Sequence, residues 1–357
     1  MRDRQLPLFD DHSPPDGPLR HAAAVEPAAV PDRVRALGLT LPPAIRLGTS
    51  SWSFPGWKGL VFAPRDGRPE SESRLAREGL AAYARHPLLR TVSLDRTFYA
   101  PLTAAEFAGY AAQVPEDFRF VVKAPAAFTD PVVRRAGSGE PSRDNATFLD
   151  AAAAVAAFVR PAVEGLGARA GPLVFQFPPL GRRLLANVPR LVARLAAFAA
   201  VIRRAVPEAI VALEPRDPAL AGPALAAALA DSGAVPCLAV HARMPGAAAQ
   251  AAAFGLDGPA RRGPLVARWN LHAGHRHEEA KQAYFPFNRL IQEDPPTRTT
   301  LASLAARAAA HGRDVFITIN NKAEGSAPCS VEKLAGAIMA CPSPWHVGQG
   351  ESVPKTP

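Results

Sequence analysis

The stretch that decides the fold is RLGTSSWSFPGWKGLVFAP, residues 46–64 of a chain of 357 residues. Residues 46–49 form a short apolar run typical of a buried strand, and the residues that follow include turn formers without a helical period. A strand therefore delivers Trp52 and Trp57 onto a loop. Two indoles on a loop indicate either the wall of a binding site or a hydrophobic plug over a core, and the sequence leaves both open.

Seven later segments repeat this design, a short apolar run that ends at a polar residue. They predict strands over 89–99, 118–125, 172–179, 209–218, 236–243, 265–272 and 314–321. Helices are expected between them, over 70–86, from 103 onward, and over 145–165, 182–206, 219–231, 299–311 and 330–340. This alternation predicts an α/β fold, a closed (β/α)8 barrel of the TIM type, because a doubly wound open sheet would expose two apolar edge strands.

The barrel is expected to be a single domain over residues 44–341, with a polar tail at 342–357. Residues 1–43 are rich in proline and charge and are predicted to be a disordered tail. Within this tail, QLPLF resembles the motif by which bacterial replication and repair proteins dock on the sliding clamp. Its clamp-binding residues would be Gln5, Leu6, Leu8 and Phe9, although so short a motif also arises by chance in a leucine-rich chain.

The chain is basic, with a formal net charge of +9. Such a balance favours anionic partners, either small phosphate- or carboxylate-bearing molecules or nucleic acid, but an arginine-rich solvated surface explains it equally well. The cysteines Cys237, Cys329 and Cys341 are odd in number and widely spaced, which predicts reduced thiols in a cytoplasmic protein. No secretory segment or membrane span is evident from the sequence, so no membrane partner is expected.

Several motifs occur together in a fixed order. They are GTSSWSFPGWKG at 48–59, TFY at 97–99, VPEDFRFVVKAP at 114–125, FQFPP at 175–179, ALEPRDP at 212–218, and NN followed by a Gly and an Ala-Pro at 320–328. In these motifs the chain resembles the YecE-like family, catalogued as domain of unknown function 72. The resemblance implies a TIM-type barrel, and the family lacks an established reaction.

The chain also departs from the family pattern. Ser93 stands where a Glu is usual, Asp95 where an Asn is usual, and Asp130 where a His is usual. Trp269-Asn270 replaces a common His-Gly. Without a carboxylate at position 93, a mechanism that needs two carboxylates depends on Asp95 as the substitute.

In barrels of this kind the working site gathers at the carboxyl ends of the strands. The residues expected there are Trp52, Trp57, Tyr99, Lys123, Gln176, Glu214, Arg216, His241, Arg268 and Asn320. Because Lys123 and the arginines outnumber Glu214, the mouth is predicted to be net positive and to attract phosphate or carboxylate. On the second strand, Asp95, Thr97 and Tyr99 are expected to alternate onto one face.

Two of these residues are the candidates for catalysis. Glu214 is the candidate general acid or base, with a structural ion pair to Arg216 or Lys123 as the alternative. Lys123 is a candidate for Schiff-base chemistry, or else a charge partner or phosphate ligand. We assign no metal and no cofactor, because no local spacing requires Asp95, Glu214, His241 and His272 to converge and the run HAGHRHEE at 272–279 is typical of a solvated loop.

The sequence thus favours an enzyme that acts on an anionic substrate by general acid/base chemistry. Two other functions stay open. One is a nucleic-acid-associated repair protein docked on the sliding clamp through its tail. The other is a barrel that binds a ligand without catalysis, which the missing carboxylate at Ser93 favours.

Overall fold

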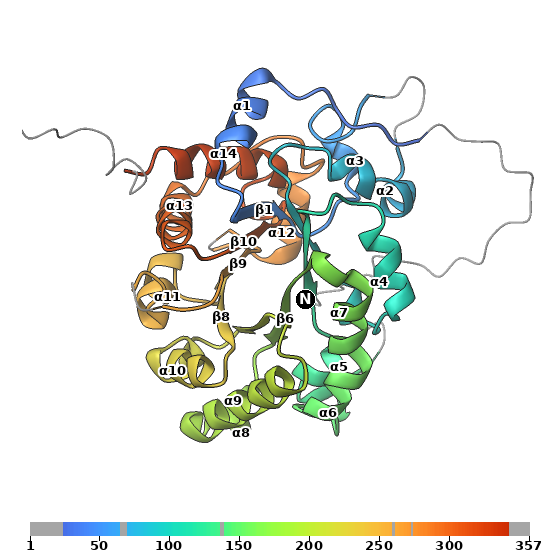
Figure 1. The fold of residues 1–357 in the computed structure, drawn as a ribbon. Helices are drawn as coiled ribbons and strands as arrows, with labels where there is room; N and C mark the ends of the chain where they lie inside the picture. Colours follow the sequence, from blue (N-terminus) through green and yellow to red (C-terminus); the bar gives the residue numbers. More distant parts are fainter. Residues whose placement is uncertain (1–23, 65–69, 136–138, 259–260, 273, 343–357) are drawn as a thin grey trace, which may run out of the picture.

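The computed structural model describes residues 24–64, 70–135, 139–258, 261–272 and 274–342, which form a closed barrel of parallel strands surrounded by helices (Figure 1). The strands follow the order β1-β10-β9-β8-β7-β6-β3-β2, and β2 pairs with β1 to close the ring. They are β1 (Ile45–Thr49), β2 (Thr91–Leu94), β3 (Arg119–Lys123), β6 (Ala170–Phe177), β7 (Val211–Pro215), β8 (Val235–Val240), β9 (Leu265–Trp269) and β10 (Val315–Ile319). The predicted TIM-type barrel is confirmed.

Alternation along the strands separates two apolar layers. A small cluster fills the barrel interior and consists of Val121, Val174, Ala212, Val235, Cys237, Val266 and Phe316. Their neighbours in sequence, such as Leu213 on β7 and Ile317 on β10, belong to the larger core between strands and helices. Because side chains two apart share a face, the next interior layer toward the carboxyl ends is polar and holds Lys123, Gln176, Glu214 and Arg268.

Gly48 explains part of the sequence that decides the fold. A Cβ added there would lie 1.8 Å from the carbonyl oxygen of Thr91 on β2. A side chain at this position would therefore collide with the backbone of the neighbouring strand, at the pair that closes the ring.

The outside of the barrel is covered by amphipathic helices. They include α4 (Ala104–Ala111), α7 (Arg160–Leu166), α9 (Val188–Ala205), α10 (Pro223–Asp231), α11 (Ala247–Phe254), α13 (Pro295–Ala310) and α14 (Ala327–Met339). In α9 the buried residues Leu191, Leu195, Phe198 and Ile202 recur at helical spacing, and Asn187 caps the first turn by accepting from the Arg190 N–H at 3.0 Å. Further helices are α2 (Glu72–Glu78), α3 (Leu80–Tyr83), α5 (Ala126–Thr129), α6 (Ala151–Ala154) and α8 (Gly181–Leu185).

One helical run among the described residues, Ala151–Arg169, is long and apolar enough by length and composition to cross a membrane. Its buried residues include Phe158, Val159 and Leu166, which belong to the core around the barrel. The run is therefore a covering helix of a barrel of the soluble type, and such a segment is weak evidence for a membrane span.

The expectation of a disordered tail over residues 1–43 is wrong for its last part. Residues 32–40 form α1 (Asp32–Thr40), which buries Val34 against the core. The Arg90 guanidinium donates to the carbonyl oxygens of Leu41 (3.0 Å) and Pro42 (3.1 Å), just beyond the helix. Composition did not reveal this, because the helix is held by contacts with residues far along the chain.

The predicted strand over 89–99 is also too long. β2 ends at Leu94, and Arg96–Phe98 form a single tight helical turn. The Thr97 hydroxyl donates to the Leu94 carbonyl at 2.8 Å, a local bond that competes with an extended backbone. The prediction that Asp95, Thr97 and Tyr99 alternate on one strand face is therefore wrong: Thr97 is buried, whereas Tyr99 is exposed.

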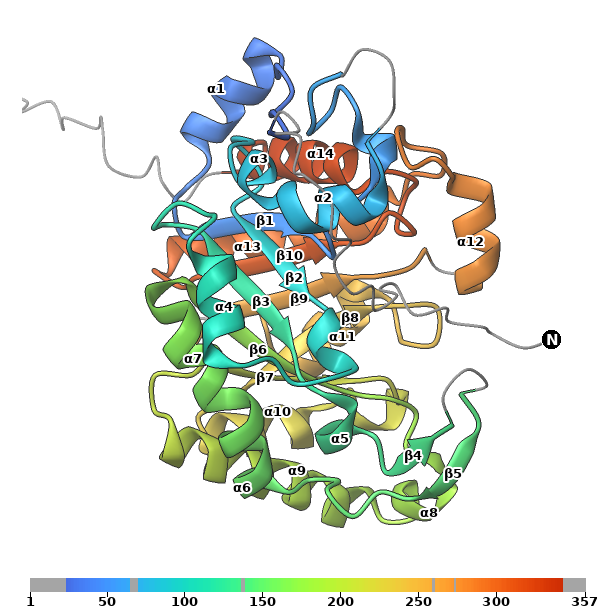
Figure 2. The same ribbon diagram turned by 90° about the vertical axis from the view of Figure 1, so that its right-hand side faces the viewer.

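Several elements had no counterpart in the sequence prediction, among them α5 and α11 and the two features described next. After α5 the chain forms an antiparallel hairpin of β4 (Val132–Arg134) and β5 (Pro141–Asp144), which lacks the apolar alternation that identifies strands. The run at 272–279, expected to be a solvated loop, leads into α12 (His277–Tyr284), which buries Ala280 and Tyr284. Figure 2 shows the hairpin and α12 on the side toward which the barrel strands run.

Candidate functional site

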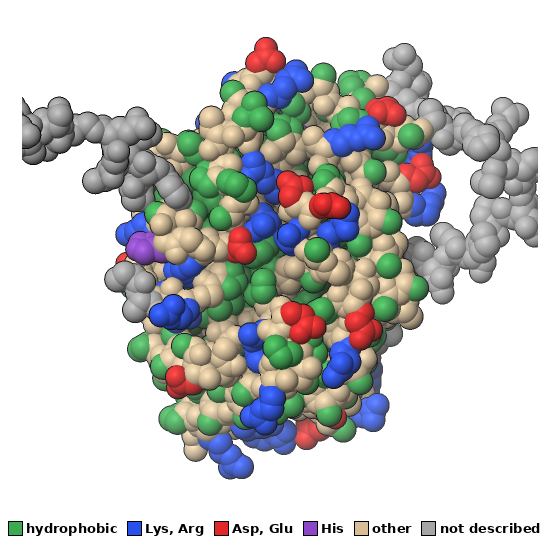
Figure 3. Space-filling model, in the orientation of Figure 1, with side chains coloured by type: hydrophobic (Ala, Val, Ile, Leu, Met, Phe, Trp, Pro, Cys, Tyr) green, Lys and Arg blue, Asp and Glu red, His purple; other side chains and the backbone are tan. Residues whose placement is uncertain are grey.

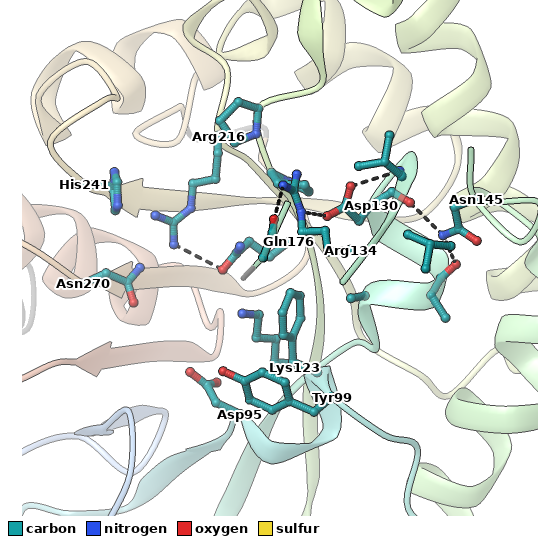
Figure 4. Close-up of a pocket in the computed structure, with 18 of the residues that line it drawn as sticks. Asp95, Tyr99, Lys123, Asp130, Arg134, Asn145, Gln176, Arg216, His241 and Asn270 are labelled. Carbon is teal, nitrogen blue, oxygen red and sulfur yellow. Dashed lines mark hydrogen bonds and ion pairs between the residues drawn. The ribbon is translucent and has the colours of Figure 1, made fainter. Parts of the chain in front are cut away.

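A cavity of about 1220 Å³ opens at the carboxyl ends of the barrel strands. Of the predicted site residues, the cavity is lined by Tyr99, Lys123, Gln176, Arg216, His241, Arg268 and Asn320. In Figure 4, Asp95, Lys123 and Tyr99 lie on one side of the cavity and Arg216, His241 and Asn270 on another. The structure thus brings together residues that are as far apart in sequence as Tyr99 and Asn320.

An ion network forms the floor of the cavity. Arg268 is 2% exposed and donates to Glu214 Oε2 at 2.8 Å. Its other terminal nitrogen donates to both oxygens of Asp95, at 2.9 and 2.8 Å. One buried guanidinium therefore joins two carboxylates, from β7 and from the end of β2.

The remaining groups of the floor complete this network. Arg216 pairs with the other oxygen of Glu214 and donates to Gln176 Oε1 at 3.3 Å. The Ser93 hydroxyl donates to Asp95 Oδ1 at 2.6 Å. Ser93, the residue at which the chain departs from the family pattern, thus orients the carboxylate that stands two positions away.

Glu214 belongs to the floor network but does not line the cavity, and it has no exposed surface. Burial alone would raise the pKa of its carboxyl, but the adjacent Arg216 and Arg268 guanidiniums outweigh burial and lower the pKa. A carboxylate with both oxygens paired and no access to the cavity is poorly placed to transfer a proton to a ligand. The geometry favours the structural ion pair that the sequence left open.

Lys123 is the one amine among the described residues that line the cavity. Its Nζ lies 3.6 Å from the centre of the Phe98 ring. Lys123 takes no part in the ion pairs of the floor. These join Glu214 with Arg216 and Arg268, and Asp95 with Arg268. Burial, opposed in part by Asp95, lowers the pKa of Lys123 to about 8. A substantial fraction of this amine is therefore neutral under mildly alkaline conditions.

Three further predicted residues line the rim. Burial, together with the Arg216 charge, lowers the pKa of His241 to about 4, so its ring is neutral at pH 7. The Arg243 backbone N–H donates to His241 Nδ1 at 3.3 Å, which leaves the ring proton on Nε2. Asn320 donates to the Ser50 hydroxyl at 2.7 Å, and Tyr99 is 57% exposed. His241 and Tyr99 are thus the polar rim groups that a ligand can reach.

The prediction that Trp52 and Trp57 form walls of the site is wrong. Trp57 is fully buried and donates its indole N–H to Asn321 Oδ1 at 3.1 Å. Trp52 is 7% exposed and donates to the Leu75 carbonyl at 3.0 Å. Both indoles have hydrogen-bond partners within the core, and neither lines the cavity. They therefore form the hydrophobic plug that the sequence left as the alternative.

Sequence reasoning missed the part of the cavity that the hairpin supplies. Asp130, Arg134, Arg143 and Asn145 line it, although none was a candidate site residue. The only signal was Asp130, already noted as a departure from the family pattern. Arg134 and Arg143 lie on short exposed strands, where arginine is ordinarily uninformative.

Charge is distributed differently at the cavity and on the outer surface. The described cavity lining includes seven Lys and Arg residues but only two acidic residues, Asp95 and Asp130. On the face shown in Figure 3, by contrast, basic side chains are scattered among acidic and apolar ones. The cavity is therefore a place of concentrated positive charge.

Two other sequence hypotheses concern metals and the tail. In the part of the chain that the structure describes, no three His, Cys, Asp or Glu side chains lie close enough together to hold a metal ion. Of the four side chains considered for a metal, Asp95 and Glu214 are both engaged by Arg268. The clamp-binding residues Gln5, Leu6, Leu8 and Phe9 lie outside the described residues.

Comparison with known proteins places the chain in a family. The family model described as "Protein of unknown function DUF72" matches residues 46–347, which include all of the barrel strands except Ile45, the first residue of β1. The chain belongs to the DUF72 family. This confirms the resemblance to the YecE-like family seen in the sequence motifs, and no curated protein matches the chain significantly.

Solved structures of the DUF72 family share the fold. A DUF72 family protein from Enterococcus faecalis, 16% identical, aligns with a TM-score of 0.56 over 83% of this chain and 95% of its own. A DUF72 family protein from Thermotoga maritima, 19% identical, aligns with a TM-score of 0.50 over 83% of this chain and 99% of its own. At such low identity the likeness supports the fold alone.

Proposed function

We propose that this DUF72 protein is an enzyme that binds a small phosphate- or carboxylate-bearing molecule in the barrel mouth and uses Lys123 for proton transfer. The observation that carries the proposal is Lys123 itself, an amine that lines the cavity with a lowered pKa and packs on an aromatic ring. A general acid or base works best when its pKa is close to the working pH. The excess of basic residues around it favours an anionic ligand.

In this proposal Glu214 positions other groups and does not react. It fixes Arg216 and Arg268, so the guanidiniums are held in place before a ligand arrives. Neutral His241 supplies an Nε2–H donor, and the phenol of Tyr99 supplies a second polar contact. Because Asp95 is engaged by Arg268, a mechanism with two free carboxylates has no support in this geometry.

Binding of inorganic phosphate tests the ligand class. Isothermal titration of the full chain is compared with Lys123→Met and with Lys333→Met, a control at an exposed lysine on α14. Loss of one charge-assisted contact predicts about a tenfold weaker affinity for Lys123→Met and no change for the control. Equal affinities of the two variants would remove Lys123 from the anion site.

Turnover tests the enzyme itself. A panel of phosphorylated and carboxylated metabolites is incubated with the wild-type protein and with Lys123→Met, and products are measured by mass spectrometry. We expect a product in the wild-type sample alone, with a rate that rises between pH 7 and pH 9 if Lys123 acts as a base. Anion binding without turnover across the panel would favour the barrel that binds a ligand without catalysis.

A further inference from the structure

The cavity is large for a ligand with one anionic group. Its volume of about 1220 Å³ exceeds the range of roughly 300–1,000 Å³ that is common for small-molecule sites. Part of its wall comes from the barrel, with Lys123 and Arg216, and part from the β4–β5 hairpin, with Arg134 and Arg143. In Figure 4, Arg134 and Asp130 lie on a different side of the cavity from His241 and Asn270.

The hairpin is anchored to the barrel, which fixes where its arginines lie. The Asp130 side chain is 6% exposed and accepts from the Val132 N–H at 3.1 Å and from Arg134 Nε at 2.7 Å. At the other end of the hairpin, the Asn145 amide donates to the carbonyl oxygens of Ala127 (2.8 Å) and Asp130 (2.7 Å). Both ends of the hairpin are thus tied to the segment that follows β3.

Positive charge on this wall is only partly compensated. The Arg134 guanidinium forms an ion pair with the Asp130 carboxylate, but the Arg134 side chain remains 42% exposed. Arg143 forms no ion pair with any described residue, whereas the adjacent Asp144 pairs with Arg183, which does not line the cavity. The hairpin therefore presents to the cavity at least one guanidinium that has no carboxylate of its own.

Apolar side chains also line the cavity. They include Val132, Val133, Pro178, Pro179 and Phe98. A ligand that reaches both basic regions passes through a cavity with this apolar lining, which suits an uncharged spacer and disfavours charge in the middle of the molecule. A compact single anion would occupy only one region.

We infer that the ligand is a small molecule with an anionic group at each end of an uncharged spacer. One group binds at Lys123 and Arg216, and the other at Arg134 and Arg143. A bisphosphate, or a molecule with one phosphate and one carboxylate, has this form. The inference rests on the proposed function, because the first anionic group occupies the site proposed there.

Binding of synthetic linear phosphates tests the second subsite. The full chain is titrated with hexyl phosphate and with butanediol, hexanediol and octanediol bisphosphates, so that the spacer length is varied. We expect at least one bisphosphate to bind about tenfold more tightly than hexyl phosphate. The affinities of octanedioate and heptanoate are compared in the same way, as the two-ended and one-ended carboxylates.

The variant Arg143→Met isolates the hairpin because it leaves no carboxylate unpaired. We expect it to weaken the best bisphosphate about three- to fivefold and to leave hexyl phosphate unchanged. Arg143→Lys should retain part of the tighter binding of the bisphosphate relative to hexyl phosphate. Arg183→Met removes a nearby exposed arginine that does not line the cavity and should change neither affinity.

The outcomes separate this inference from the proposed function. If hexyl phosphate binds through Lys123 but no two-ended anion binds more tightly, the second subsite is wrong and the proposed function stands. A bisphosphate advantage that Arg143→Met leaves undiminished also overturns the hairpin subsite. If no phosphate or carboxylate probe binds, and Lys123→Met matches the wild type throughout, both ideas fail.

Discussion

Arg268 is the residue whose removal should disturb the site most, and Arg268→Met is the sharpest test of the floor network. Methionine fills a similar length of the barrel interior without the guanidinium. The variant removes the hydrogen-bond donor to Glu214 Oε2. It also removes the donor to both carboxylate oxygens of Asp95. Glu214 stays buried with Arg216 alone, whereas Asp95 is 38% exposed and keeps the Ser93 hydroxyl.

Removing one partner of a buried ion pair costs about 3–5 kcal/mol. Because Glu214 retains one guanidinium and Asp95 is partly solvated, we expect a loss near the lower end, about 3 kcal/mol. In a domain of this size that loss lowers the melting temperature by roughly 4–6 °C. The control is Arg33→Met, which breaks a surface pair with Glu332 at an arginine that is 72% exposed, and it should change stability by less than about 0.5 kcal/mol.

The pH dependence distinguishes a lost ion pair from a simple packing defect. In the wild type the pKa of Glu214 is lowered, so its pairing stabilises the fold above the ordinary value of 4.5, and this stability is lost as the pH falls through the folded pKa. Arg268→Met raises the pKa of Glu214. The difference in the free energy of unfolding between variant and wild type should therefore be greatest at neutral pH and shrink below about pH 4.5.

Urea unfolding followed by circular dichroism, from pH 4 to pH 8, measures this difference. Adding Glu214→Gln to Arg268→Met should recover part of the loss, because the second change removes the incompletely paired buried charge. A loss for Arg268→Met no larger than that of the Arg33→Met control, or one that is constant with pH, would refute the network as the source of stability.

Four other perturbations have defined outcomes. Lys123→Met should raise the free energy of unfolding at pH 7 by up to about 3 kcal/mol, since a folded pKa of about 8 against 10.5 means that the fold disfavours the charged amine, most fully below pH 8; equal stability in urea would contradict this. Gly48→Ala should prevent or severely weaken folding, seen as loss of soluble protein, because its methyl group would overlap the Thr91 carbonyl. Trp57→Phe should cost about 2 kcal/mol in urea unfolding but leave phosphate affinity intact, as expected for a core residue. If the tail binds the sliding clamp, Leu8→Ala and Phe9→Ala should each abolish capture of the full chain on immobilised clamp, and capture that survives both would exclude the motif.

The sequence predicted those parts of the site that follow from strand periodicity. Once eight strands were assigned, the period of two placed Lys123, Gln176, Glu214 and Arg268 toward the barrel interior. It could not show that Arg268 bonds both Glu214 and Asp95, because those partners are 54 and 173 positions away. Pairing across a barrel depends on register and shear, which a single sequence does not contain.

The features that sequence reasoning missed have related causes. Trp52 and Trp57 follow a strand end, where a wall and a plug have the same local pattern, and long-range partners such as Asn321 decide between them. The hairpin arginines belong to a short insertion without apolar periodicity, anchored by Asp130 and Asn145. A contact distant in sequence thus decided the place of Trp57, whereas side-chain hydrogen bonds within a short insertion decided that of the hairpin.

Closure of the ring by β1 and β10 has a consequence for synthesis of the protein. Ile45 pairs with Val315, so the first strand leaves the ribosome long before its final neighbour has been translated. Throughout that interval β1, apolar and unpaired on one side, is open to association with other nascent chains. Yield in cells should accordingly depend on chaperones that shield such edges, even for variants whose purified forms are stable.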